Sequence, residues 1–203
     1  MLTKLDDLYL PHHWHLDRTD ECYFGGEYTA GRGFAHSNTN QLIFNFKKSP
    51  DRRGLPDWGY KALAIWQAAE NLRNSLREEF LASATFVPVP PSKAVEDPGY
   101  DDRMTQLLRL LGGNVDVREL VRQAGNMRDA HRAENRPGPA ELYDNYQIDE
   151  AVVEPRPEQI AVVDDVLTTG AHFKAMKRIL NETYPGIRIV GIFIARRVPG
   201  TEQ

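Results

Sequence analysis

The sequence predicts an α/β fold, in which helices flank a mostly parallel β-sheet. Short apolar runs rich in β-branched residues occur at Ile160–Val163 and Arg188–Ala195, and such runs are typical of strands buried on both faces. Between them, Ala171–Tyr184 has the composition of a helix that Pro185 and Gly186 end. This alternation of strand, helix and strand favours a parallel sheet with helices on its faces.

The first part of the chain is expected to be mostly extended, so we divide the chain into an N-terminal hood at 1–56 and an α/β core at 57–203. Gly25 and Gly26 separate two short apolar segments and predict a hairpin there. Leu42–Phe46 alternates apolar and polar residues and predicts a half-buried strand. His12, His13 and His15 match no zinc pattern, so we expect them on the surface or at a pocket rim.

The core begins with a helix expected over Trp58–Phe80, because apolar residues recur there near the helical period. The apolar positions that define this helix are Leu63, Trp66, Leu72 and Leu76. The other elements predicted before the central motif are a strand at Thr85–Pro90, a helix at Asp101–Leu111, a strand at Val115–Val121 and an edge strand at Tyr143–Ile148.

A long loop is expected at about 122–143, because this segment is poor in apolar residues and closes with Pro-Gly-Pro. Long loops in compact domains are often lids over a binding site. The basic residues of this loop could close over a charged substrate, and they include Arg128, His131, Arg132 and Arg136.

Composition limits the classes of function. The 203 residues are 41% hydrophobic and 27% charged, which is typical of a globular protein. The net charge of −4 and the lack of a basic block argue against a nucleic-acid partner. Cys22 is the one cysteine, so an intrachain disulfide is excluded and a reducing compartment is favoured. The N-terminus resembles neither a signal peptide nor a membrane span, and we expect a cytoplasmic protein with no membrane partner.

The most informative stretch is IAVVDDVLTTGAHF at Ile160–Phe173, which predicts a strand, a tight turn and a helix. A loop that enters a helix N-terminus presents free backbone N–H groups and a partial positive charge, so it favours an anion such as phosphate. Thr168 and Thr169 can add hydroxyl donors, and Gly170 permits close approach. A Walker B strand would need a partner G-x-x-x-x-G-K-[ST], and the chain has none.

Asp164 and Asp165 stand at the carboxyl end of the predicted strand, where open α/β sheets bind ligands. Carboxylates accept hydrogen bonds from vicinal hydroxyls. The pattern therefore fits a sugar phosphate, with its phosphate on the loop and its ribose on the aspartates.

Residues Ile160–Ala171 resemble the phosphoribosyl-pyrophosphate (PRPP) signature of the type I phosphoribosyltransferases, in which hydrophobic residues precede two acids and T-T-G. His172 departs from the signature, because the family usually has Thr or Ser there. Within that superfamily the chain most resembles ComF-like and amidophosphoribosyltransferase-like members. This wider likeness lies in V-P-V-P-P-S-K at Val87–Lys93, G-Y-D-D at Gly99–Asp102 and H-R-x-x-x-R at His131–Arg136. A cysteine-rich zinc ribbon, common in ComF-like proteins, is missing.

The resemblance implies a type I phosphoribosyltransferase fold, a Rossmann-like sheet with a small hood, and pentosyl transfer from PRPP to a nitrogen acceptor such as a nucleobase or amine. Mg²⁺ would be the cofactor, bound mainly through PRPP and with no dedicated protein ligands. A homodimer is compatible with it. The resemblance implies that Asp164 and Asp165 are catalytic. The implied phosphate-binding residues are Val166, Leu167, Thr168, Thr169, Gly170, Ala171 and His172. The implied diphosphate and lid residues are Pro91, Ser92, Lys93, Arg128, His131, Arg132 and Arg136.

Two other functions stay open at this point. The superfamily contains members that bind PRPP or a nucleotide without catalysis, and His172 favours such a sensing regulator. The third hypothesis is a ComF-like accessory protein in DNA uptake or nucleic-acid metabolism, against which the acidic net charge and the missing zinc ribbon count.

Overall fold

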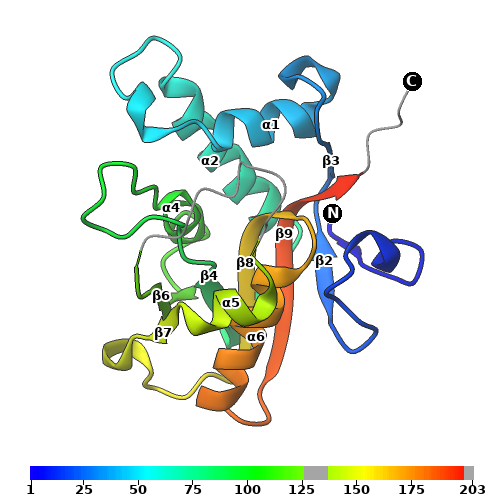
Figure 1. The fold of residues 1–203 in the computed structure, drawn as a ribbon, viewed down its shortest axis with the longest axis vertical. Coiled ribbons are helices and arrows are strands. Elements are labelled where there is room, and N and C mark those ends of the chain that lie inside the picture. Colours follow the sequence, from blue (N-terminus) through cyan, green and yellow to red (C-terminus); the bar gives the residue numbers. More distant parts are fainter. Residues whose placement is uncertain (126–136, 199–203) are drawn as a thin grey trace.

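The computed structural model of the chain describes residues 1–125 and 137–198, and in it helices flank a mostly parallel sheet (Figure 1). The strands follow the order β1-β2-β9-β8-β4-β5; β1 is antiparallel to β2, and the other neighbours are parallel. A separate antiparallel pair consists of β6 and β7. The strands are β1 (Thr3–Lys4), β2 (Cys22–Phe24), β3 (Glu27–Thr29), β4 (Ala84–Pro88), β5 (Asp116–Val117), β6 (Val121–Gln123), β7 (Tyr146–Ile148), β8 (Gln159–Leu167) and β9 (Arg188–Val198).

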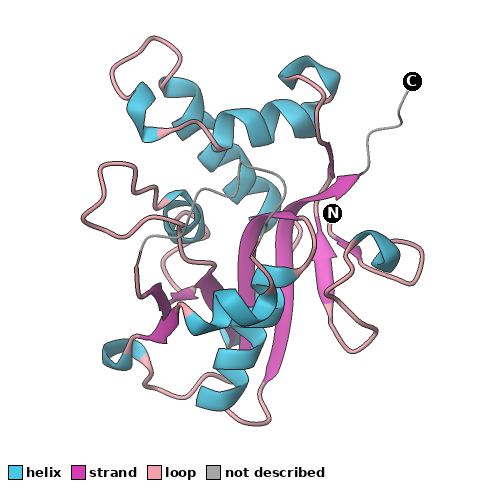
Figure 2. Cartoon of the chain, in the orientation of Figure 1, coloured by secondary structure: helices cyan, strands magenta, loops and turns pink. Residues whose placement is uncertain are grey.

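Helices cover both faces of the sheet (Figure 2). The α-helices are α1 (Asn38–Phe46), α2 (Gly59–Arg73), α3 (Glu78–Ser83), α4 (Arg103–Arg109), α5 (Pro139–Asp144) and α6 (Ala171–Thr183). Short 3-10 helices are η1 (Leu10–His12), η2 (Phe34–His36), η3 (Pro50–Arg52) and η4 (Glu150–Val152). The apolar core is accordingly divided: α2, α3 and α4 pack on one face of β4, β8 and β9, and α5 and α6 pack on the other. No helix within the described ranges is long and apolar enough to cross a membrane.

β8 is the central strand, and it pairs with β9 over a longer stretch than with β4. Its ladder with β9 runs from Gln159 to Leu167, whereas its ladder with β4 ends where Pro88 pairs with Val163. Beyond Val163 the edge of β8 that faced β4 is therefore free of a neighbouring strand. The two aspartates of the motif follow at this opening.

The strand expected at Leu42–Phe46 is wrong, because these residues belong to α1. Ser37 caps this helix: its hydroxyl accepts a hydrogen bond from the Asn40 backbone N–H at 3.0 Å. The buried Asn40 side chain also exchanges hydrogen bonds with the backbone of Thr29, so it fastens α1 to β3. Ile43 and Phe46, three residues apart, are the buried positions in the predicted strand, which is a helical spacing.

The predicted hairpin at Gly25–Gly26 is also wrong. β2 and β3 do not pair with each other, because both run parallel to β9 in succession. A Cβ at Gly25 would lie 2.9 Å from the carbonyl oxygen of Ile194, so this glycine lets the chain pass close to β9. Residues 1–56 thus contribute β1, β2 and β3 to the main sheet.

Other elements differ from the expectation in extent. The helix predicted at Trp58–Phe80 is two helices, α2 and α3, and Leu63 and Trp66 are exposed instead of facing the core. The strand predicted at Val115–Val121 is divided between β5 of the main sheet and β6 of the small one. The predictions for β4, α4, β8, α6 and β9 are confirmed within a few residues at their ends. The edge strand predicted at Tyr143–Ile148 is confirmed only in β7, because Tyr143 and Asp144 belong to α5. The loop predicted at 122–143 is shorter than expected, since β6 enters its start and α5 its end.

Replacing Ser37 with alanine should lower the free energy of unfolding by about 1 kcal/mol, because the first turn of α1 loses its side-chain cap. Urea unfolding of the two proteins measures the difference. The control is Ser37→Thr, which keeps a hydroxyl and should retain most of the stability. Equal stability of Ser37→Ala and the unaltered protein would contradict the capping role.

Candidate functional site

A candidate site lies at the carboxyl ends of β4 and β8, where the order of the sheet reverses. The chain goes outward from β4 to β5 and later returns to place β8 on the other side of β4. The helix after β4 packs on one face of the sheet, and the helix after β8 packs on the other. Open α/β sheets bind their ligands in the crevice at such a switch point.

The loop Thr168–Gly170 joins β8 to α6 and forms one wall of this site. Gly170 has φ +86°, and a Cβ at this residue would lie 2.4 Å from Cγ of Leu16, so only glycine fits. The Ala171 backbone N–H donates to the Thr169 hydroxyl at 3.3 Å. The following N–H groups of the first helical turn have no partner inside the helix, and such groups favour an anion at a helix N-terminus.

The N-terminal segment supports this loop from outside. The buried His13 donates from Nδ1 to the carbonyl of Thr168, and the His15 backbone N–H donates to the carbonyl of Thr169 at 3.0 Å. Burial lowers the pKa of His13. The expectation of a surface or rim position is therefore wrong for His13, because its ring is enclosed as a support of the loop.

Ion pairs hold the same segment on α6. Lys174 contacts Asp17 and Asp20 at 2.8 Å each, and Lys177 contacts Asp20 at 2.7 Å. The Asp20 side chain is fully buried, so this pairing is much less screened than a surface ion pair. The first twenty residues thus hold both the Thr168–Gly170 loop and the first half of α6.

Asp165 is held by two cations from different helices. Lys47, which follows α1, contacts its Oδ1 at 2.8 Å, and Arg103, the first residue of α4, contacts its Oδ2 at 2.8 Å. Burial alone would raise the pKa of this carboxyl, but the two cations hold the pKa of Asp165 well below its usual range. Both of its oxygens are engaged, so Asp165 connects three elements of the structure.

The network continues to a buried lysine in α2. Arg103 also contacts Asp101 at 2.7 Å, and Lys61 contacts the same carboxylate at 2.8 Å. Lys61 is 4% exposed, and it donates to the carbonyl oxygens of Phe46 and Lys48 at the end of α1. Burial lowers the pKa of Lys61, and these three acceptors compensate for the water that its ammonium has lost.

Asp164 differs from its neighbour, since no ion pair involves it within residues 1–125 and 137–198. Its Oδ1 accepts a hydrogen bond from the backbone N–H of Asp165 at 2.7 Å. Burial and the adjacent Asp165 carboxylate raise the pKa of Asp164 to about 7. A carboxylate without an ion pair near the carboxyl end of β8 is suited to a ligand that brings hydroxyls or a metal ion.

His172, the second residue of α6, lies next to Tyr146 of β7. The Tyr146 hydroxyl is 2.8 Å from Nδ1 of His172. Burial, with the negative charge of Asp164, raises the pKa of Tyr146. Burial lowers the pKa of His172 to about 4, so the imidazole is neutral at pH 7.

The structure brings the Pro91–Lys93 turn to the same edge. The Val89 backbone N–H donates to the carbonyl of Val163 at 2.9 Å, so the turn follows immediately beside the aspartates. Val166 and Leu167, by contrast, lie within β8 with their side chains in the core. The predicted lid residues lie outside the described part of the chain: Arg128, His131, Arg132 and Arg136.

Sequence reasoning assigned no site role to several residues that the structure places here: Lys47, Lys61, Asp101, Arg103 and Tyr146. A lysine inside the otherwise apolar stretch of α2 was an available signal for Lys61. The partners of Asp165 gave no comparable signal, because they lie far away along the chain.

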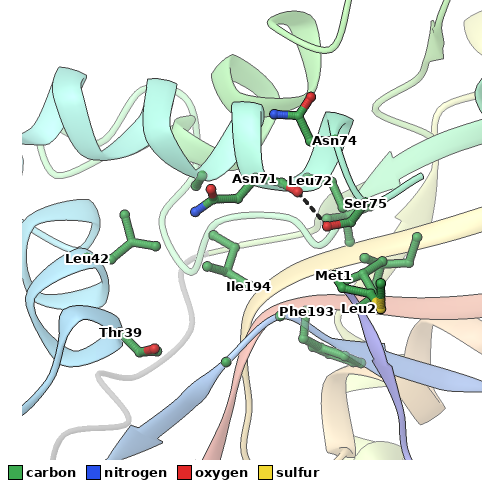
Figure 3. A pocket seen from close by; sticks show the side chains of 15 residues that line it. Met1, Leu2, Thr39, Leu42, Asn71, Leu72, Asn74, Ser75, Phe193 and Ile194 are labelled. Carbon is green, nitrogen blue, oxygen red and sulfur yellow. Dashed lines mark hydrogen bonds between the residues drawn. The ribbon is translucent and has the colours of Figure 1, made fainter. Parts of the chain in front are cut away.

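Two features of the surroundings bear on binding: the side chains that could hold a metal ion, and a neighbouring pocket. In the part of the chain that the structure describes, His, Cys, Asp and Glu side chains form no group of three that could hold a metal ion. A pocket of about 350 Å³ lies between α1, α2 and β9, with Thr39, Asn71 and Ile194 in its wall (Figure 3). Its lining includes Val163 but neither aspartate, so it is separate from the crevice.

Comparison with protein-family models gives no match, and neither does comparison with curated proteins.

Asp164→Asn and Asp165→Asn should change stability in opposite directions. The pKa of Asp164 is raised from 3.8 in the folded state, so the free energy of unfolding falls as the pH rises toward 7 and this buried carboxyl ionises. Asparagine does not ionise, so the variant avoids that loss of stability. We expect Asp164→Asn to be about 2 kcal/mol more stable than the unaltered protein at pH 8 and equal to it near pH 4. Asp165→Asn should be less stable by on the order of 2 kcal/mol at pH 8.

Urea unfolding at both pH values measures these differences. The two variants serve as controls for each other, since both exchange a carboxylate for an amide of the same shape. Destabilisation of both at pH 8 would contradict the division of roles.

Proposed function

We propose that this protein binds PRPP and transfers its phosphoribosyl group to a nitrogen acceptor, as a phosphoribosyltransferase. The observation that best supports the proposal is the position of Asp164. Its carboxylate has no ion-pair partner in the described ranges, and it stands at the start of the opening beyond Val163, with the Thr168–Gly170 loop a few residues further on. A ribose phosphate carries both a phosphate, which suits the loop, and vicinal hydroxyls, which suit the carboxylate.

Each group of residues then has a role in binding. The 5-phosphate accepts hydrogen bonds from the Thr168–Gly170 loop and the first turn of α6. The ribose hydroxyls donate to Asp164. Lys93 supplies a point charge toward the diphosphate from the β4 turn. Asp165 acts indirectly, because its ion pairs with Lys47 and Arg103 keep the end of β8 in place.

The donor set of the site fits Mg²⁺ bound mainly through the substrate. Hard oxygen ligands suit this ion, and it keeps several waters, so few protein ligands are required. The diphosphate and ribose hydroxyls would hold it, with Asp164 as the nearby protein carboxylate. When bound, the ion would neutralise charge on the diphosphate.

The reaction is a displacement at C1 of the ribose. The acceptor nitrogen forms a bond to C1, the bond from C1 to the diphosphate oxygen breaks with its electron pair on that oxygen, and the nitrogen releases a proton. Ionised Asp164 stabilises the positive charge that develops on the ribose ring. Most of the acceleration would come from this preorganised charge and from positioning.

A second candidate function is a sensor that binds PRPP or a nucleotide without catalysis. The contacts of Asp165 favour this sensor, because Lys47 and Arg103 occupy both oxygens of its carboxylate and leave only Asp164 of the two acids available to the ligand. His172, which stands where the motif usually has Thr or Ser, also favours the sensor. The two candidates share the ligand and differ in whether diphosphate is released.

Titration calorimetry with PRPP and Mg²⁺ should give binding, and a panel of bases and amines should include one that triggers diphosphate release. Gly170→Ala should weaken PRPP binding at least about tenfold, because the added methyl group displaces the loop against Leu16. Release with one acceptor supports the transferase, and binding without release supports the sensor.

The matched control is Gly186→Ala. Gly186 also has a positive φ, +80°, but it follows α6 at its far end and a Cβ there meets nothing within 4 Å. This variant should bind PRPP normally. Failure of the unaltered protein to bind PRPP, with or without Mg²⁺, would overturn both candidates.

A further inference from the structure

Tyr146 is a buried residue whose hydroxyl group contacts His172 in the first turn of α6. It is 5% exposed and lies in β7, where it pairs with Gln123 of β6. Its hydroxyl lies 2.8 Å from Nδ1 of His172. Within residues 1–125 and 137–198 this is the one hydrogen bond of the Tyr146 hydroxyl.

The direction of that hydrogen bond follows from burial. If Nδ1 carried the proton and donated to Tyr146, the phenolic hydrogen would have no acceptor among the described residues. A buried donor without an acceptor is unfavourable, because nothing compensates for the water that it has lost. The arrangement that satisfies both groups has the Tyr146 hydroxyl donating to an unprotonated Nδ1, and a neutral His172 then carries its proton on Nε2.

His172 occupies the position at which this tautomer matters. It is the second residue of α6, so it belongs to the helical turn whose free N–H groups bind an anion. The ring is only partly exposed, and its Nε2 has no hydrogen-bond partner in the described ranges. Nε2–H is therefore a donor available to a ligand, whereas a bare Nε2 would repel a phosphate oxygen.

We propose that Tyr146 is a positioning residue that fixes His172 as the Nε2–H tautomer, so that the imidazole donates a neutral hydrogen bond to the phosphate monoester of the ligand. The imidazole thus replaces the hydroxyl that the motif normally carries. The inference rests on the proposed function for its ligand, but its first half concerns the free protein alone.

Nitrogen NMR of the uniformly ¹⁵N-labelled protein tests the first half. At pH 7, the ring nitrogens of His172 should have the shifts of the neutral Nε2–H form, with assignment from the signals that a His172→Thr variant lacks. In Tyr146→Phe these shifts should move toward an average of the two tautomers. Neutral Nδ1–H or a protonated ring in the unaltered protein would overturn the inference.

Calorimetry with ribose 5-phosphate tests the second half. Tyr146→Phe should weaken binding about fivefold, which corresponds to the loss of one neutral hydrogen bond. The matched control is Tyr143→Phe, because the Tyr143 hydroxyl donates to Glu182 at the far end of α6. Adding Tyr146→Phe to a His172→Thr background should cause no loss of binding beyond that of His172→Thr alone.

The double variant separates positioning from a general structural effect. If Tyr146→Phe weakens binding equally in both backgrounds, Tyr146 acts independently of His172 and the inference is overturned. Inorganic phosphate, titrated in the same NMR experiment, separates this inference from the proposed function. A response of His172 to phosphate in a protein that binds no PRPP would support the inference and overturn the function, and no response to phosphate, ribose 5-phosphate or PRPP would overturn both.

Discussion

The structure of the crevice depends on the Asp165 carboxylate. It accepts hydrogen bonds from Lys47 and Arg103 and so joins the end of α1 and the start of α4 to the central strand. In a site of low dielectric constant, such a group is tolerated only when cations and donors surround it. Both cations pair with Asp165 and not with the adjacent Asp164, and burial together with the Asp165 carboxylate raises the pKa of Asp164. One constraint therefore produces an ion-paired acid and, at the preceding position, an acid without an ion pair among the described residues.

Several groups at the crevice lower the stability of the fold, as is common where function requires polar groups in buried places. Asp164 is close to another carboxylate, Lys61 is an ammonium in the core, and Gly170 takes a left-handed conformation. Several contacts offset these unfavourable groups. His13 and Leu16 hold the phosphate loop, and the ion pairs of Asp20 hold the helix that follows it.

The strand, loop and helix of the central motif could be predicted because their signals lie within one contiguous stretch. The prediction of a strand at Leu42–Phe46 was wrong because so short a segment fits both the helical and the strand period. The Ser37 cap and the burial of Asn40 favour a helix. The partners of Asp165 could not be found from the sequence. Lys47 and Arg103 are separated from it by 118 and 62 residues, and only the folded sheet brings them together.

Carboxyl ¹³C NMR of the aspartates, followed as a function of pH, measures the division of roles most directly. The account predicts that Asp164 titrates near pH 7, that Asp165 stays ionised throughout the acidic range in which the protein is folded, and that ribose 5-phosphate shifts the Asp164 signal alone. Titration of both carboxyls near the ordinary value of 3.8 would contradict it, because neither the two-cation clamp nor the isolated ligand-facing carboxylate would then exist.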